Sequence, residues 1–203
     1  MVPAPGCAIV LPAAGGSTRM RGADKLLEPV EGLPLLRRQA TAALATGAEV
    51  AVTLRPGDVE RRAALAGLNV TVIEVAQAAE GMAASLRAGA DWAEARGAGA
   101  LMVVLPDMPD LAAEDFVRLR DAWRAVPDQP VRATDARGTP GHPVVFPARL
   151  FASLHAVTGD QGARTVLDRA PPRLLALPGL RALTDLDTPE AWARWRAGRE
   201  TAR

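Results

Sequence analysis

An α/β fold, in which a mostly parallel sheet lies between two layers of helices, is predicted from two patterns in the sequence. Short apolar runs rich in β-branched residues recur through the first half, and segments with apolar residues at helical spacing separate them. Each run is apolar almost without interruption, which is typical of strands that helices cover on both faces. Strands and helices that alternate in this way build a parallel sheet with right-handed crossovers, and therefore a three-layer sandwich.

The individual elements follow from the same patterns. In the first half we expect strands at residues 7–11, 50–54, 70–75 and 100–105, and helices at residues 33–46, 58–65 and 82–95. In the second half we expect helices at residues 112–125, 147–155, 161–170 and 188–196, and short strands at 174–177 and 180–186. The Pro- and Gly-rich stretch at 126–147 predicts loops and short strands. Because no change in composition marks a linker, residues 1–203 are predicted to form one domain.

The composition excludes several classes of protein. The net charge is +1 and the pI is about 8.0, whereas general nucleic-acid binders need massed positive charge. No apolar run approaches the roughly 18 residues that a membrane span needs, and residues 1–16 lack the basic region of a signal peptide. Two histidines and a single cysteine argue against a His/Cys zinc site. That cysteine, Cys7, cannot form an intramolecular disulfide, so we expect a reducing, cytoplasmic location.

The loop after the first predicted strand has the composition of a phosphate-binding loop. Gly15 and Gly16 would let the backbone turn sharply and bring N–H groups close to an anion, and Ser17 would add a hydroxyl donor. Arg19 and Lys25, the only lysine in the chain, would neutralise a polyphosphate from two sides. The P-loop and the dinucleotide fingerprint are both absent. A solvated linker rich in Gly and Ser is the alternative.

Two acidic positions are candidates for metal binding. Asp107 follows an apolar strand directly, where a carboxylate can hold a metal at the carboxyl edge of the sheet; a turn residue is the alternative. Asp185 and Asp187 would share one face of a strand end. Asp187 could instead belong to a helix start at Thr188 and Pro189, which would leave Asp185 unexplained.

Residues 11–27, LPAAGGSTRMRGADKLL, resemble the signature A-A-G-x-S-x-R-M-G-x-x-K-L of the small-molecule nucleotidyltransferases, with Arg21 as one additional residue. The resemblance implies a Rossmann-like mixed-sheet fold, also found in glycosyltransferases of the A type. It also assigns nucleotide binding to this loop, with Arg19 and Lys25 acting in catalysis together with Asp107. The implied nucleotide-binding residues of the loop are Ala13, Ala14, Gly15, Gly16, Ser17, Arg19 and Lys25.

Two further segments resemble motifs of the same family. Residues 80–86 match a G-M-x-x-S-L segment, which implies that Gly81 and Ser85 lie against the nucleotide, although the Asn-Pro pair usual upstream is missing. Residues 185–190 match the motif D-x-D-T-P-E. By that resemblance Asp107 and Asp187 hold Mg²⁺ or Mn²⁺, with Asp185 behind them or as an alternative ligand.

Residues 138–144 and 159–164 resemble motifs of one branch, the molybdenum cofactor cytidylyltransferase-like proteins. The resemblance implies transfer of CMP from CTP to the phosphate of a molybdopterin-type cofactor. His142 and Arg164 would bind that phosphate. Residues 1–110 would then form the nucleotide-binding half and residues 111–203 the acceptor-binding half.

The expected partners are CTP and a phosphorylated pterin-type molecule, with a molybdoenzyme or its maturation factor as a candidate protein partner. Neither nucleic acid nor a membrane is expected. Two alternatives remain at this point: a CTP- or GTP-dependent nucleotidyltransferase with another phosphorylated acceptor, such as a sugar phosphate, and a non-catalytic module that carries a cofactor.

Overall fold

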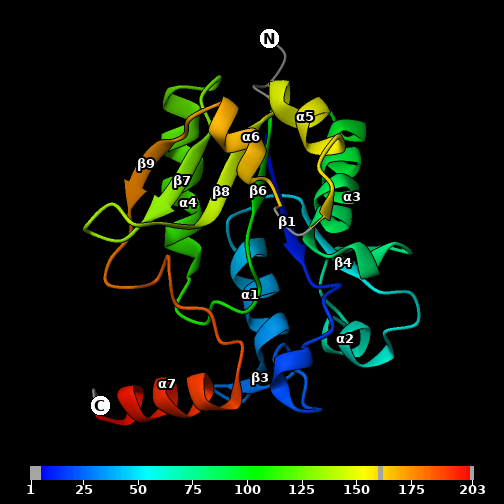
Figure 1. The fold of residues 1–203 in the computed structure, drawn as a ribbon, viewed down its shortest axis with the longest axis vertical. Coiled ribbons are helices and arrows are strands. Elements are labelled where there is room, and N and C mark those ends of the chain that lie inside the picture. Colours follow the sequence, from blue (N-terminus) through cyan, green and yellow to red (C-terminus); the bar gives the residue numbers. More distant parts are fainter. Residues whose placement is uncertain (1–5, 160–161, 202–203) are drawn as a thin grey trace.

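A seven-stranded sheet forms the centre of the molecule. The computed structural model describes residues 6–159 and 162–201. The strand order is β5-β4-β1-β6-β8-β7-β9 (Figure 1). The strands are β1 (Cys7–Pro12), β4 (Val50–Leu54), β5 (Thr71–Glu74), β6 (Ala100–Val103), β7 (Val131–Thr134), β8 (Pro140–Pro147) and β9 (Arg173–Ala176).

Only β8 runs against the other strands of this sheet within the described residues. β5, β4, β1 and β6 pair in parallel, β8 pairs antiparallel with both β6 and β7, and β9 is parallel to β7. The mostly parallel mixed sheet is therefore confirmed. A separate two-stranded hairpin, β2 (Pro29–Val30) with β3 (Leu33–Pro34), precedes the first helix.

Helices cover both faces of the sheet. They are α1 (Leu35–Leu44), α2 (Val59–Ala64), α3 (Met82–Ala95), α4 (Ala113–Ala125), α5 (Phe151–His155), α6 (Arg164–Arg169) and α7 (Pro189–Thr201). Short 3-10 helices lie at η1 (Thr18–Met20), η2 (Ala78–Glu80) and η3 (Ala148–Leu150). Among the described residues, no helix is both long and apolar enough to cross a membrane.

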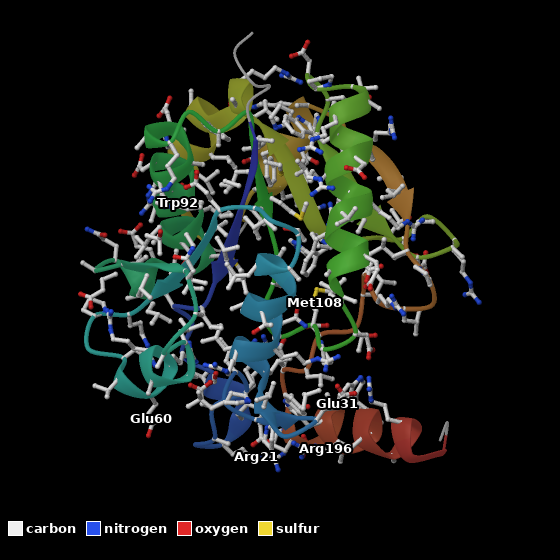
Figure 2. The ribbon with its side chains drawn as sticks, turned by 180° about the vertical axis from the view of Figure 1, so that it is seen from behind. Arg21, Glu31, Glu60, Trp92, Met108 and Arg196 are labelled. Atoms are coloured by element: carbon white, nitrogen blue, oxygen red, sulfur yellow. The ribbon has the colours of Figure 1, made fainter. Side chains whose placement is uncertain are left out.

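Side chains of β1 alternate between two hydrophobic cores. Ile9 and Leu11 pack with α1 and α4 on one face, whereas Ala8 and Val10 pack with α3, α5 and α6 on the other. Figure 2, seen from behind, places α1 and α4 in front of the sheet, with Met108 labelled beside them. This alternation explains why the strand is apolar throughout, and it confirms the three-layer arrangement.

The C-terminal helix α7 lies at the carboxyl edge of the sheet, next to the small hairpin (Figure 1). Trp192 of α7 is buried together with Met20, Val30 and Leu186 in a cluster of its own. Thr188 precedes the helix and caps its N-terminus, since its hydroxyl accepts the Ala191 N–H at 3.2 Å. The helix start that the sequence predicts at Thr188 and Pro189 is therefore found.

One sequence prediction about an element is wrong, and another is confirmed with different bounds. Residues 180–186 form turns and loop instead of a strand, because Leu180 accepts backbone bonds from Leu183 and Thr184 and closes a tight turn. The helix expected at 33–46 begins only at Leu35, because the residues before it pair in the hairpin.

Candidate functional site

Three carboxylates meet at the carboxyl edge of the sheet. Asp107 follows β6, and Asp185 and Asp187 lie in the segment before α7. One oxygen from each lies within 4.8 Å of the others. The two segments are joined by the backbone, since Leu186 N–H donates to the Asp107 carbonyl at 3.0 Å. The predicted acidic pair is thus brought together, with Asp185 as a third member.

Lys25 bridges two of the three carboxylates of this acidic cluster. Its Nζ lies 2.5 Å from Asp107 Oδ2 and 2.6 Å from Asp187 Oδ1. Burial alone would lower the pKa of Lys25, but the two carboxylates outweigh it and raise that pKa above its usual value. Arg19 is 69% exposed and reaches Asp187 Oδ2 at 2.7 Å. Both predicted cations therefore lie beside the carboxylates.

The carboxylates of the cluster differ in their ionisation. Partial burial acts to raise the pKa of both Asp185 and Asp187. At Asp187 the hydrogen bond and the charge of Lys25 outweigh burial, so the pKa of Asp187 is lowered. At Asp185 the hydrogen bond with Asp187 adds to burial, so the pKa of Asp185 is raised. Oδ1 of Asp107 is buried and has no hydrogen-bond partner among the described residues. Closely spaced carboxylates with an unpaired oxygen suit a hard divalent cation such as Mg²⁺ or Mn²⁺.

The predicted phosphate loop is shaped differently from the expectation. Neither Gly15 nor Gly16 has a positive φ; the residues of the loop with a positive φ are Ser17 (49°), Arg21 (53°) and Gly22 (97°). A side chain at Gly15 would meet no atom within 4 Å, so the backbone there faces open space. The Ser17 hydroxyl is already engaged, since it donates to Asp24 at 3.1 Å. The loop therefore offers backbone N–H groups more than hydroxyl groups.

A cavity of about 140 Å³ lies between this loop and the acidic cluster. Five predicted residues line it: Gly15, Lys25, Gly81, Ser85 and Asp107. Ala13 and Ala14 are buried in the hydrophobic cores, so their side chains do not line the cavity. Ala13 and Ala14 can therefore contact a nucleotide only through their backbone groups. Gly16 is exposed and follows Gly15, but it does not itself line the cavity.

A second cavity of about 610 Å³ holds the two residues expected to bind the acceptor, His142 and Arg164. Met82 lines both cavities, so the two adjoin. Arg132, which the sequence does not single out, also lines the second cavity. Burial and the nearby charge of Arg164 lower the pKa of Arg132. Two guanidinium groups that face one space favour an anion there.

His142 lies on β8, because the stretch predicted to form loops and short strands contains this eight-residue strand, which pairs with β6 and β7. Burial, with the charge of Arg132, lowers the pKa of His142 to about 4, against the opposing effect of Asp107. The imidazole is therefore neutral near pH 7 and would contact a phosphate as a hydrogen-bond donor. Of the motif at 159–164, Asp160 and Gln161 lie outside the described residues.

Three residues of this region are not identified from the sequence: Asp24, Arg61 and Arg132. Arg61 of α2 is 1% exposed and contacts the loop after β1. Asp24 binds Arg61 and precedes Lys25. The motif pattern places Asp24 in the loop, which is a weak signal, but no local pattern marks either arginine.

The comparison with known families settles the relationship. Residues 8–174 match the MobA-like NTP transferase domain. The chain belongs to this family. The resemblance to small-molecule nucleotidyltransferases is thereby confirmed, and the Rossmann-like fold agrees with solved relatives of this MobA-like domain.

Rv0371c from Mycobacterium tuberculosis H37Rv is 30% identical, with a TM-score of 0.80 over 95% of this chain and 98% of that chain. A manganese complex of Rv0371c is 28% identical, with a TM-score of 0.75 over 94% of this chain and 97% of that chain.

Two curated proteins are related to this chain, and the name of one of them states an enzymatic function. The molybdenum cofactor guanylyltransferase of Rhodobacter capsulatus is 37% identical over 109 residues, which is 54% of this chain and 55% of that protein. The bifunctional protein GlmU of Bradyrhizobium is 33% identical over 182 residues, which is 86% of this chain and 40% of that protein. The chain thus spans about half the length of these relatives.

Proposed function

We propose that this MobA-like domain is a metal-dependent nucleotidyltransferase, which transfers CMP from CTP to the phosphate of a molybdopterin-type cofactor and releases pyrophosphate. The observation that carries the proposal is the contact of Lys25 with Asp107 and Asp187 beside an open loop at the carboxyl edge of the sheet. A carrier would need a pocket but no such cluster of charge. The family match supports the reaction class.

In the proposed reaction, an oxygen of the acceptor phosphate forms a bond to the α-phosphorus of CTP. The bond from that phosphorus to the bridging oxygen breaks, and pyrophosphate leaves with the electron pair. No base is required, because the acceptor phosphate is already an anion near neutral pH. The chain's part is positioning and charge stabilisation, as in other phosphoryl transfers. Lys25 and Arg19 neutralise the charge that grows on the pyrophosphate.

Asp107 and Asp187 would hold Mg²⁺ or Mn²⁺, with Asp185 close enough to contribute. Such an ion, when bound, would neutralise phosphate charge and polarise the phosphoryl oxygens. The manganese complex of Rv0371c supports a divalent metal in this fold.

The choice of CTP depends on the sequence Ala13-Ala14-Gly15, whose form accompanies pyrimidine nucleotides in the family that it resembles. GTP is the second candidate, which the molybdenum cofactor guanylyltransferase relative favours. Direct competition among the four nucleoside triphosphates decides between them. Tighter binding of GTP than of CTP would contradict the proposed base preference and leave the reaction class intact.

The acceptor is proposed to bind in the 610 Å³ cavity. Arg132, Arg164 and neutral His142 would contact its phosphate, while Leu86 and Phe146 offer apolar surface to a ring system. We expect Arg164→Ala to raise the Kd of the acceptor and to leave the Kd of CTP unchanged. A raised Kd of CTP with an unchanged Kd of the acceptor would show that CTP, and not the acceptor, binds in this cavity. A molybdoenzyme or its maturation factor, which would receive the product, remains the proposed protein partner.

The experiment that tests the function is a pyrophosphate-release assay with each nucleoside triphosphate, Mg²⁺ or Mn²⁺, and purified molybdopterin. We expect release that depends on acceptor, on metal and on Asp107, with Asp107→Asn lowering kcat by about 100-fold or more. Asp121→Asn, an exposed carboxylate of α4, is the matched control. Nucleotide binding without turnover on molybdopterin or on sugar phosphates would support the carrier alternative.

A further inference from the structure

Arg61 of α2 is buried, and every hydrogen bond that its guanidinium donates among the described residues goes to one loop. Asp58, the residue before α2, lies 3.8 Å from Arg61 Nε as a further ion pair. The Nη1 of Arg61 donates to the carbonyls of Ala13 at 2.6 Å and Gly15 at 2.7 Å. Its Nε and Nη2 bind the two oxygens of Asp24 at 2.7 and 2.8 Å, and Nη2 also reaches the Ser17 hydroxyl at 3.0 Å. One guanidinium therefore holds both ends of the loop between β1 and Lys25.

The carbonyl contacts determine where the loop's N–H groups point. In a trans peptide the C=O and the following N–H lie on opposite sides. When Arg61 binds the carbonyls of Ala13 and Gly15, the N–H groups of Ala14 and Gly16 face away from the guanidinium. Neither N–H has a hydrogen-bond partner among the residues that the structure describes. Gly15, between them, lines the 140 Å³ cavity.

We infer that Arg61 is a positioning residue of the nucleotide site, which holds the N–H groups of Ala14 and Gly16 toward the triphosphate. This inference rests on the proposed function, since it requires that the loop bind a nucleotide. Arg61 does not touch the substrate; it acts through the peptide planes of the loop. Through Asp24 it also fixes the backbone next to Lys25, because the Leu26 N–H donates to Asp24 at 3.0 Å.

Core stability alone would not select this arrangement. A buried ion pair contributes little net stability compared with apolar side chains of similar volume. The guanidinium, however, matches two carbonyls and a carboxylate at once, which neither lysine nor an apolar residue can do. Burial of Arg61 is therefore explained by the shape that it imposes on the loop.

The test compares Arg61→Met and Arg61→Lys with Arg62→Lys, a matched control on the same helix. Arg62 is exposed and pairs with Glu74 at 2.5 Å. Glu60, on the same helix, points away from the molecule in Figure 2. Calorimetry gives the Kd of the nucleoside triphosphate with metal, and steady-state kinetics give KM and kcat. Hydrogen exchange at the N–H groups of Ala13 and Leu26, which are hydrogen-bonded at the two ends of the loop, reports the loop directly.

We expect both Arg61 variants to raise the nucleotide Kd at least about tenfold, because hydrogen bonds to charged phosphate are the strong class. Exchange in the loop should quicken, and the KM of the acceptor should stay unchanged. A purely structural role would lower the active fraction, and therefore kcat, with an unchanged nucleotide Kd. The Arg62→Lys control should match the wild-type protein.

An unchanged nucleotide Kd in folded Arg61→Lys would overturn the inference. That variant keeps the positive charge beside Asp24, so it decides the matter if Arg61→Met does not fold. A wild-type protein that binds no nucleoside triphosphate would instead contradict the proposed function. The two failures are therefore distinguishable.

Discussion

At the scale of single residues, His142 is a side chain whose ionisation depends on the fold. Burial and the charge of Arg132 lower its pKa from 6.5 to about 4. Between these two pH values the unfolded chain takes up a proton that the folded protein does not. The free energy of unfolding therefore falls as the pH falls through this window.

We expect the wild-type protein to lose more stability than His142→Gln as the pH is lowered from 6.5 toward 4. Between pH 8 and pH 7, where this histidine is neutral in both states, the two proteins should change in parallel. Urea unfolding at each pH measures the difference. Equal slopes below pH 6.5 would show that burial does not suppress protonation of His142.

The residues of the acidic cluster can be predicted from the sequence, whereas Arg61 and Arg132 cannot. Asp107 follows a strand end, and strand ends of a parallel sheet meet at one edge. Of the 24 basic residues only one is lysine, so an individual arginine carries no distinguishing signal. Arg61 acquires its role from contacts with residues as many as 48 positions away in the chain.

At the scale of elements, β8 and the segment before α7 approach more closely than a side chain would allow. A Cβ added at Gly141 would lie 1.9 Å from the carbonyl oxygen of Ala182. The N–H of His142 donates to the same carbonyl at 2.9 Å. This contact fixes the chain just before Asp185 and Asp187, so a strand of the sheet sets the position of the acidic segment.

We expect Gly141→Ala to displace that acidic segment and to weaken binding of Mn²⁺ with nucleotide, with a stability loss of about 1–3 kcal/mol from overpacking. Titration with Mn²⁺ followed by electron paramagnetic resonance measures the first effect, and urea unfolding the second. Gly198→Ala on α7, where an added Cβ meets no atom within 4 Å, is the control. Normal metal binding in folded Gly141→Ala would show that the segment adapts.

The same close approach explains an element that sequence patterns place wrongly. The apolar spacing of residues 180–186 is compatible with a strand, but a strand needs a partner. This segment passes across β8 near Gly141 instead of pairing along an edge. The β2–β3 hairpin is missed for another reason, because strands of two residues are too short to show a period.

At the scale of the whole molecule, the sequence predicts the class of the sheet but not its full strand order. The parallel strands of the first half follow from local patterns, whereas the reversed β8 depends on long-range pairing with β6 and β7. The candidate site joins Lys25 to Asp187 across 162 positions. A division into a nucleotide half, 1–110, and an acceptor half, 111–203, stays a prediction.

The single lysine among residues 1–203 makes the candidate site chemically addressable. Within residues 1–203, Lys25 is the only side-chain amine that amine-selective acylation can modify. Lys25 is 18% exposed. We expect acylation of Lys25 to abolish activity, and we expect nucleotide with metal to slow that acylation. Mass spectrometry of proteolytic fragments measures the extent of acylation at Lys25. Labelling at an equal rate with and without nucleotide would contradict the placement of Lys25 at the phosphates.

The position of Lys25 between Asp107 and Asp187 also means that the protein carries its own counter-ion. A divalent cation that arrives alone must compete with an ammonium already in place, whereas a nucleotide that draws the ammonium away leaves the carboxylates free. Binding of cation and of polyanion should therefore be reciprocally linked, by about 5- to 150-fold for a typical coupling. Removing the ammonium in Lys25→Met should tighten Mn²⁺ binding in the absence of nucleotide, which resonance titration detects. The wild-type enzyme would then hold metal weakly at rest and firmly only when its nucleotide is present.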